Sequence, residues 1–194
     1  PVFSFGQIFF IIVSCLALYR AVLFIHEIAH FKKGTYALFR WVWNMLCGFP
    51  FMVPAFLYQP VHFDHHKQNF YGTRKDGEYF PFALKGRMWI VFHVLISFLV
   101  PILFLARFSV LTPLSLVDKR LRQFLMERMS ALVIDLDYQR PESSWKNAES
   151  WKIQEMLTCF YSWVFIGATA AKIIPAVALF LWYCVTALIF MVNS

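Results

Sequence analysis

Long apolar runs alternate with polar, basic segments along this chain of 194 residues. The apolar runs cover residues 2–25, 37–58, 88–117 and 153–192. The first run is interrupted only by scattered polar side chains and exceeds the roughly 20 residues that a helix needs to span a bilayer. The last run divides at Lys172 and Pro175, which predicts a helical hairpin with arms at 153–171 and 173–192. The pattern therefore predicts an all-α integral membrane protein with transmembrane helices.

The two middle runs are less regular than the outer ones. Run 37–58 contains the helix-breaking residues Gly48, Pro50 and Pro54, and we interpret it as an interfacial or re-entrant segment. Run 88–117 is either one span or a hairpin kinked at Pro101. The basic segment 118–152 favours the hairpin, since basic loops prefer the cytoplasm and a hairpin places both ends of the run on that side.

Composition supports a membrane protein and excludes several other classes. Hydrophobic residues make up 60% of the chain, against roughly 45 to 50% in soluble domains. The net charge is +7, but the basic residues are spread between apolar runs rather than gathered on one polar domain, so we expect no nucleic-acid partner. The four cysteines lie in apolar runs without a C-x-x-C pair and are interpreted as free thiols. Because the chain starts without Met and inside an apolar run, we interpret residues 1–194 as a single membrane domain truncated at both ends.

Five of the six histidines fall into two clusters, H-E-I-A-H at 26–30 and H-F-D-H-H at 62–66. On a helix, residues spaced i, i+3 and i+4 share a face. This places His26 beside His30, and His62 beside His65 and His66. Five imidazoles exceed the three or four protein ligands of a single zinc ion, so the count points to two metals. Basic residues follow both clusters, which predicts that the metal site faces the cytoplasm; they are Lys32, Lys33, Arg40, Lys67, Arg74, Lys75, Lys85 and Arg87.

Carboxylate and amide side chains near the clusters are candidates for orienting the imidazoles or for contacting metal or water. We expect Glu27 and Asp64, which lie inside the clusters, to orient the imidazoles through the second ring nitrogen. The remaining histidine, His93, is interpreted as a packing residue of an apolar run. Asn44 and Asn69 are further candidates for contacts with water or metal, and Asp76 is the acidic residue outside the clusters that can add a carboxylate ligand.

Two alternatives of different classes remain open at this point. H-E-x-x-H is also the signature of zinc proteases, in which Glu27 would act as general base. Such a site needs one further ligand and an open position, whereas this chain supplies three more histidines in one group. The other alternative is a membrane binding or scaffold protein without catalysis.

The two clusters together resemble the histidine boxes of the membrane fatty acid desaturase family, which shares its box architecture with membrane hydroxylases. The first box of that family, H-x(3 or 4)-H, matches 26–30, and the second box, H-x-x-H-H, matches 62–66. A third box, H-x-x-H-H or Q-x-x-H-H, follows the last pair of spans in the family and does not occur in these 194 residues.

The resemblance implies a non-haem di-iron centre, with two iron ions held mainly by imidazoles and O2 as co-substrate. It implies O2-dependent desaturation of a lipid or fatty acyl chain, with hydroxylation as the nearest alternative. A redox metal is needed because no amino-acid side chain can abstract hydrogen from a saturated chain. The implied partners are a lipid acyl substrate in the membrane and an electron donor such as ferredoxin or cytochrome b5. The basic surface suits an acidic carrier or an anionic headgroup.

The resemblance yields a prediction about the longer reading frame. We expect the sequence that follows Ser194 to contain H-x-x-H-H or Q-x-x-H-H, because the two boxes present supply only part of the ligand set of the family. Sequencing the complete gene checks this, and a reading frame without a third histidine group would count against the desaturase interpretation.

Overall fold

The computed structural model describes residues 4–32, 34–79, 86–146 and 148–192, and in these ranges it contains helices and loops but no strand. The all-α prediction is therefore confirmed for the described part of the chain. Lys33 and Lys85, which were counted among the basic residues that place the site, lie outside the described ranges.

Helix α1 (Phe5–His30) is the longest helix in the described ranges. It begins at a capping box, in which the Ser4 hydroxyl accepts from the Gln7 backbone N–H and the Gln7 side chain accepts from the Ser4 backbone N–H. Its buried residues are confined to its second half, while aromatic side chains such as Phe9 and Phe10 are exposed. Among the described helices, α1 alone is both long and apolar enough to cross a bilayer unaided.

The run 37–58 is broken into short pieces: α2 (Ala37–Trp43), a π-turn η1 (Asn44–Gly48) and a 3-10 turn η2 (Ala55–Leu57). Asn44 closes the break, because its amide donates to the Arg40 carbonyl (3.0 Å) and its carbonyl accepts from the Ala55 N–H (2.9 Å). Asn44 therefore has a structural role, in place of the predicted contact with metal or water. Gly48 packs against Asn44, and a Cβ on Gly48 would lie 2.7 Å from the Asn44 side chain.

The run 88–117 forms one bent unit of four pieces: α4 (Met88–Ser97), α5 (Val100–Ala106), a π-turn η3 (Arg107–Leu111) and α6 (Thr112–Ser115). The two halves, Met88–Ser97 and Val100–Ser115, meet at an angle of 52°. Pro101, in the first turn of α5, cannot donate a backbone hydrogen bond into α4, which accounts for the break. Together the two halves are apolar and long enough to form either one broken span or a re-entrant loop.

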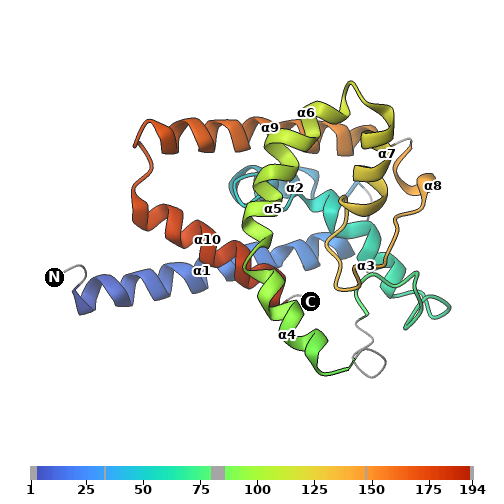
Figure 1. Ribbon diagram of the computed structural model, residues 1–194, viewed down its shortest axis with the longest axis horizontal. Helices are drawn as coiled ribbons and strands as arrows, with labels where there is room; N and C mark the ends of the chain where they lie inside the picture. The colour runs from blue at the N-terminus through green and yellow to red at the C-terminus, as the bar shows by residue number, and fades with distance from the viewer. Residues whose placement is uncertain (1–3, 33, 80–85, 147, 193–194) are drawn as a thin grey trace.

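The remaining helices are α3 (Gln59–His65), α7 (Lys119–Arg128), α8 (Glu142–Trp145), α9 (Glu149–Ala170) and α10 (Ala176–Val192). Figure 1 shows α9 running along one side of the molecule, while α10 turns away from it and crosses α1. The ring of Phe165 on α9 contacts Trp182 on α10 (centroids 4.7 Å apart), and α10 then packs on α1, α4 and α5. Helix α3 packs on the end of α1 that carries the first histidine cluster.

A buried ion-pair network ties α9 to the bent unit and to α7. The Glu155 carboxylate on α9 is 2.6 Å from the Arg107 guanidinium on η3 and 2.5 Å from that of Arg122 on α7. Arg107 also donates to the Met129 carbonyl (3.1 Å) and to the Thr112 hydroxyl. Glu155 and Arg107 are both buried, so each charge needs the other as its counter-charge.

We expect Glu155→Gln to destabilise the protein by roughly 3 to 5 kcal/mol, because it leaves a buried guanidinium without a counter-charge. Denaturant unfolding of the detergent-solubilised full-length protein measures the change. Glu149→Gln is the matched control, since Glu149 pairs with Lys152 on the exposed surface, and it should cost less than about 1 kcal/mol. Equal stability of the two variants would contradict a supporting role for the buried network.

Candidate metal centre

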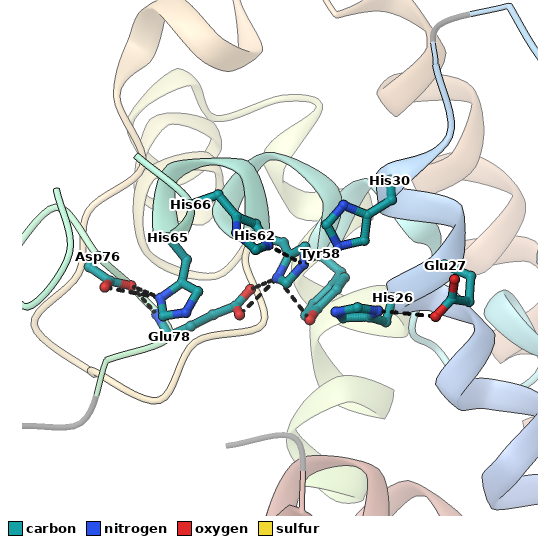
Figure 2. Close-up of polar contacts among 9 residues, drawn as sticks. All are labelled: His26, Glu27, His30, Tyr58, His62, His65, His66, Asp76 and Glu78. Atoms are coloured by element: carbon teal, nitrogen blue, oxygen red, sulfur yellow. Dashed lines mark hydrogen bonds and ion pairs between the residues drawn. The ribbon is translucent and has the colours of Figure 1, made fainter. Parts of the chain in front are cut away.

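The two histidine clusters meet where α3 packs against the last turns of α1. His26 and His30 project from α1, and the other three histidines project from α3 and its C-terminal cap (Figure 2). Helix α3 is only seven residues long, but Pro60 in its first turn presets the helical backbone and lacks the N–H that would be unsatisfied there. The helical spacing predicted from the sequence therefore occurs in both clusters.

Four imidazoles converge on one gap. The ligand nitrogens of His26, His30 and His62 all lie within 4.8 Å of one another. The Nε2 atom of His62 is 2.9 Å from Nε2 of His30 and 3.1 Å from Nε2 of His66. His62 is only 4% exposed, so it forms the inner wall of the gap. Several imidazole nitrogens aimed at a shared point are the donor set that iron or zinc takes in proteins.

Two carboxylates contact the Nδ1 atoms of histidines in the second cluster. Nδ1 of His62 is 2.9 Å from Glu78 Oε2, and Nδ1 of His65 is 2.9 Å from Asp76 Oδ1. A neutral imidazole that donates its Nδ1–H to a carboxylate keeps the Nε2 lone pair for a metal. Figure 2 shows both carboxylates entering from the same side, opposite α1.

Asp76 is completely buried and is itself held in place. Its carboxylate accepts from the backbone N–H groups of Gly72 (3.2 Å) and Glu78 (3.1 Å). Sequence reasoning considered Asp76 only as a direct ligand and missed Glu78. The available signal was the D-G-E sequence at 76–78, shortly after the second cluster.

Gly77 allows these two carboxylates to approach the histidines. A Cβ at this position would lie 2.8 Å from the Val133 side chain and 3.0 Å from that of Val61. The Gly77 carbonyl accepts from the backbone N–H groups of Ile134 (2.8 Å) and Asp135 (3.1 Å). The segment is thus clamped between α3 and the chain around residue 134, which fixes the distance from its carboxylates to the imidazoles.

The structure gives the predicted orienting residues different surroundings. Glu27 Oε1 lies 3.4 Å from His26 Nδ1, and both side chains are exposed. Asp64 instead pairs with Lys67 at 2.6 Å. The carboxylates that contact the histidines of α3 are those of Asp76 and Glu78. Asp64 follows His62 by two residues, which on a helix is a rotation of about 200°, so it points away from the cluster.

The other candidates are not among the four converging imidazoles. His65 lies on the Asp76 side of the cluster, with its ring 6.3 Å from that of His62 (Figure 2). His93 is buried on α4 and stacks on Phe190 at 5.7 Å. Asn69 is exposed.

One residue that sequence reasoning missed, Tyr58, lies against the cluster. Its ring stacks on His62 with centroids 4.9 Å apart, and its hydroxyl is 3.0 Å from His62 Nδ1. Together with Glu78, it fixes the plane of this imidazole.

The charge state of the cluster also suits metal binding. Partial burial and the neighbouring imidazoles of His62 and His65 lower the pKa of His66 below its usual value. A lowered pKa keeps this imidazole neutral at neutral pH, and the neutral form is the one that binds a metal ion.

Comparison with known proteins places the chain in a family. The fatty acid desaturase family model matches residues 3–194. The chain is 35% identical over 165 residues to a ceramide hydroxylase from Caulobacter vibrioides (strain NA1000 / CB15N). The aligned stretch covers 84% of this chain and 46% of that protein, so the chain spans about half the length of the curated relative. No solved structure matches it. The chain belongs to the fatty acid desaturase family, as the two histidine boxes predicted.

We expect Asp76→Asn to lower the metal affinity of the full-length protein by roughly 10- to 100-fold, because an amide holds the His65 Nδ1–H less firmly than a carboxylate does. Metal content after dialysis against graded chelator concentrations measures the affinity. Asp64→Asn is the matched control, since Asp64 pairs with Lys67, and it should leave metal content unchanged. The reverse ranking of the two variants would show that the carboxylate inside the box orients the imidazoles.

Proposed function

We propose that this chain belongs to a membrane enzyme that uses O2 at a histidine-held di-iron centre to oxidise a C–H bond of a lipid acyl chain. The observation that carries the proposal is the convergence of four imidazoles from α1 and α3, with the carboxylates of Asp76 and Glu78 behind the second cluster. Membership in the fatty acid desaturase family supports the same chemistry over the zinc protease and scaffold alternatives.

The residues present fit such a centre. His26, His30, His62 and His66 would hold metal in the central gap, and His65 offers a further nitrogen on the Asp76 side. When bound, iron supplies the reaction with O2 that no side chain can provide. The protein contributes by fixing the imidazoles: Glu78 and Asp76 hold the Nδ1 protons, so that the opposite nitrogens stay free for the metal.

The position of the cluster also suits a lipid substrate. His26 and His30 lie in the last turns of α1, whose first half exposes an apolar surface. In a bilayer this surface contacts acyl chains, and the cluster then lies where the helix leaves the apolar layer. An acyl chain beside α1 thereby reaches the metal centre, while the cluster faces the cytoplasm and a soluble electron donor. The net charge of +7 favours an acidic donor such as a ferredoxin or cytochrome b5.

The relative favours hydroxylation as the outcome. The protein from Caulobacter vibrioides is named a ceramide hydroxylase, and this chain shares 35% identity with it. We therefore propose a ceramide-like lipid as substrate, with hydroxylation as the first outcome. Desaturation is the second, as the histidine boxes imply: both reactions begin at a C–H bond, and the boxes do not determine whether oxygen is inserted or a second hydrogen removed.

Expression of the full-length protein in a host that lacks the activity tests the proposal. We expect lipids that gain one oxygen if the enzyme hydroxylates, or lose two hydrogens if it desaturates, as read by mass spectrometry. The purified protein should contain about two iron ions per chain, because the histidine count exceeds that of a single-metal site. The double variant His65→Ala with His66→Ala should lose both iron and product, whereas His93→Ala, which removes a ring stacked on Phe190, should keep its iron.

Each other result has a distinct meaning. One zinc ion per chain would support the protease alternative, and a protein without metal would exclude both enzymes. Oxidised lipid in cells that express the double variant would show that the reaction does not need these imidazoles.

A further inference from the structure

A polar cavity lies on the face of α3 opposite the histidines. The residues of α3 and its C-terminal end that line it follow a helical spacing that excludes the histidine positions; they are Pro60, Phe63, Asp64 and Lys67. The rest of its wall comes from residues 70–75 and 137–144, and its volume is about 730 Å³. The cavity therefore shares α3 with the metal centre but takes no part in it.

Cations gather along one wall of this cavity. The ammonium groups of Lys67 and Lys75 lie over the Phe70 ring, 4.9 and 5.2 Å from its centroid, so both are close to this ring. Arg74 lies between them in the sequence and also lines the cavity. The carboxylates of Asp64 and Asp137 line it too, and Asp64 pairs with Lys67. Three cations against two carboxylates leave a positive balance.

Tyr138 also lines the cavity, and its buried hydroxyl lacks a partner within the described ranges. Tyr138 is 4% exposed, and among the described residues its hydroxyl has no hydrogen-bond partner. A buried hydroxyl left unpaired costs roughly 1 to 3 kcal/mol, so such a group is a natural contact for a ligand. Burial raises the pKa of Tyr138 to about 12, so the phenol keeps its proton and acts as a donor.

A buried arginine adds to the positive potential on this side. Arg140 is 1% exposed, and its charge acts on the Tyr138 hydroxyl and the Asp64 carboxylate. Burial lowers its pKa to about 10, so it remains protonated at neutral pH. Its guanidinium donates to the Ser130 carbonyl (2.5 Å), while its Nε and Nη1 have no partner within the described ranges.

We propose that this cavity binds a phosphate group carried by a small molecule or a lipid. Phosphate oxygens accept strong hydrogen bonds from ammonium and guanidinium groups, and the Tyr138 hydroxyl supplies a further donor. The cavity is larger than a phosphate ion needs, and the Phe63 and Phe70 rings offer apolar surface to the organic part of the ligand. The site goes beyond the proposed oxidation and does not depend on it, since none of its residues faces the four converging imidazoles.

The cavity and the metal centre nevertheless share a wall. A Cβ on Gly77 would lie 3.2 Å from the Tyr138 ring, so the phenol packs directly on the backbone between Asp76 and Glu78. A phosphate held by the Tyr138 hydroxyl is therefore one side chain away from the carboxylates that orient His62 and His65.

Titration calorimetry on the full-length protein in a maltoside detergent tests the proposal without metal loading or turnover. Glycerol 3-phosphate represents a soluble phosphate ligand, and phosphatidic acid represents a lipid with a phosphate headgroup. Glycerol and diacylglycerol are the matched ligands without phosphate. We expect saturable binding of at least one phosphate probe and none of its matched ligand. Tyr138→Phe, which removes only the hydroxyl, should weaken binding about tenfold or more, because it deletes a hydrogen bond to a charged group.

The double variant Lys67→Gln with Lys75→Gln should weaken binding at least as much as Tyr138→Phe. Lys119→Gln with Arg120→Gln removes the same charge at an exposed position on α7 and should leave affinity unchanged. Binding of glycerol 3-phosphate would identify a soluble ligand, and binding of phosphatidic acid alone a headgroup. Absence of binding, or equal loss in the α7 control, would overturn the proposal. Tyr138→Phe keeps the test valid even if the lysine variant fails to fold.

Discussion

The packing of α3 on the last turns of α1 is the contact on which the candidate metal centre depends. The buried residues of α1, Val22, Ile25, Ile28 and Ala29, form one hydrophobic core with Tyr58 and its neighbours just before α3. The Gln59 side chain adds a hydrogen bond to the Ala29 carbonyl (3.4 Å). Hydrophobic burial stabilises this contact, and the histidines on the adjoining faces are brought together as a result. The histidine gap is therefore defined by apolar packing that is separate from the histidines themselves.

A second layer of contacts sets the orientation of the imidazoles. Asp76 and Glu78 reach the histidines because Gly77 lets their backbone pack tightly against Val61 and Val133. The backbone around Ile134 holds the Gly77 carbonyl in turn. Outer carboxylates matter for a metal site because they fix both the ring tautomer and the ring plane. The candidate metal centre thus depends on three separate parts of the chain: α1, α3 with its following loop, and the segment before Tyr138.

Two different surfaces border the candidate site. The exposed apolar half of α1 leads toward His26, whereas the side of α3 that faces away from the histidines borders a polar cavity with Lys67, Lys75 and Tyr138. Helix α3 therefore lies between the histidine gap and this polar cavity. The buried Arg107–Glu155 pair lies outside this region and holds α9 on the bent unit.

The sequence by itself determined the helical class, the family and the identity of the clustered histidines. Helical geometry fixes relations between residues three and four apart, so the shared face of His62, His65 and His66 follows from spacing alone. We predicted that Asp64 orients the imidazoles, whereas in the structure it pairs with Lys67. The tertiary structure alone decided that Asp76 and Glu78 hold the imidazoles, that Asn44 closes a backbone break, and that α10 crosses α1. These contacts join segments whose relative position depends on packing across the whole domain, and no local pattern in the sequence records that packing.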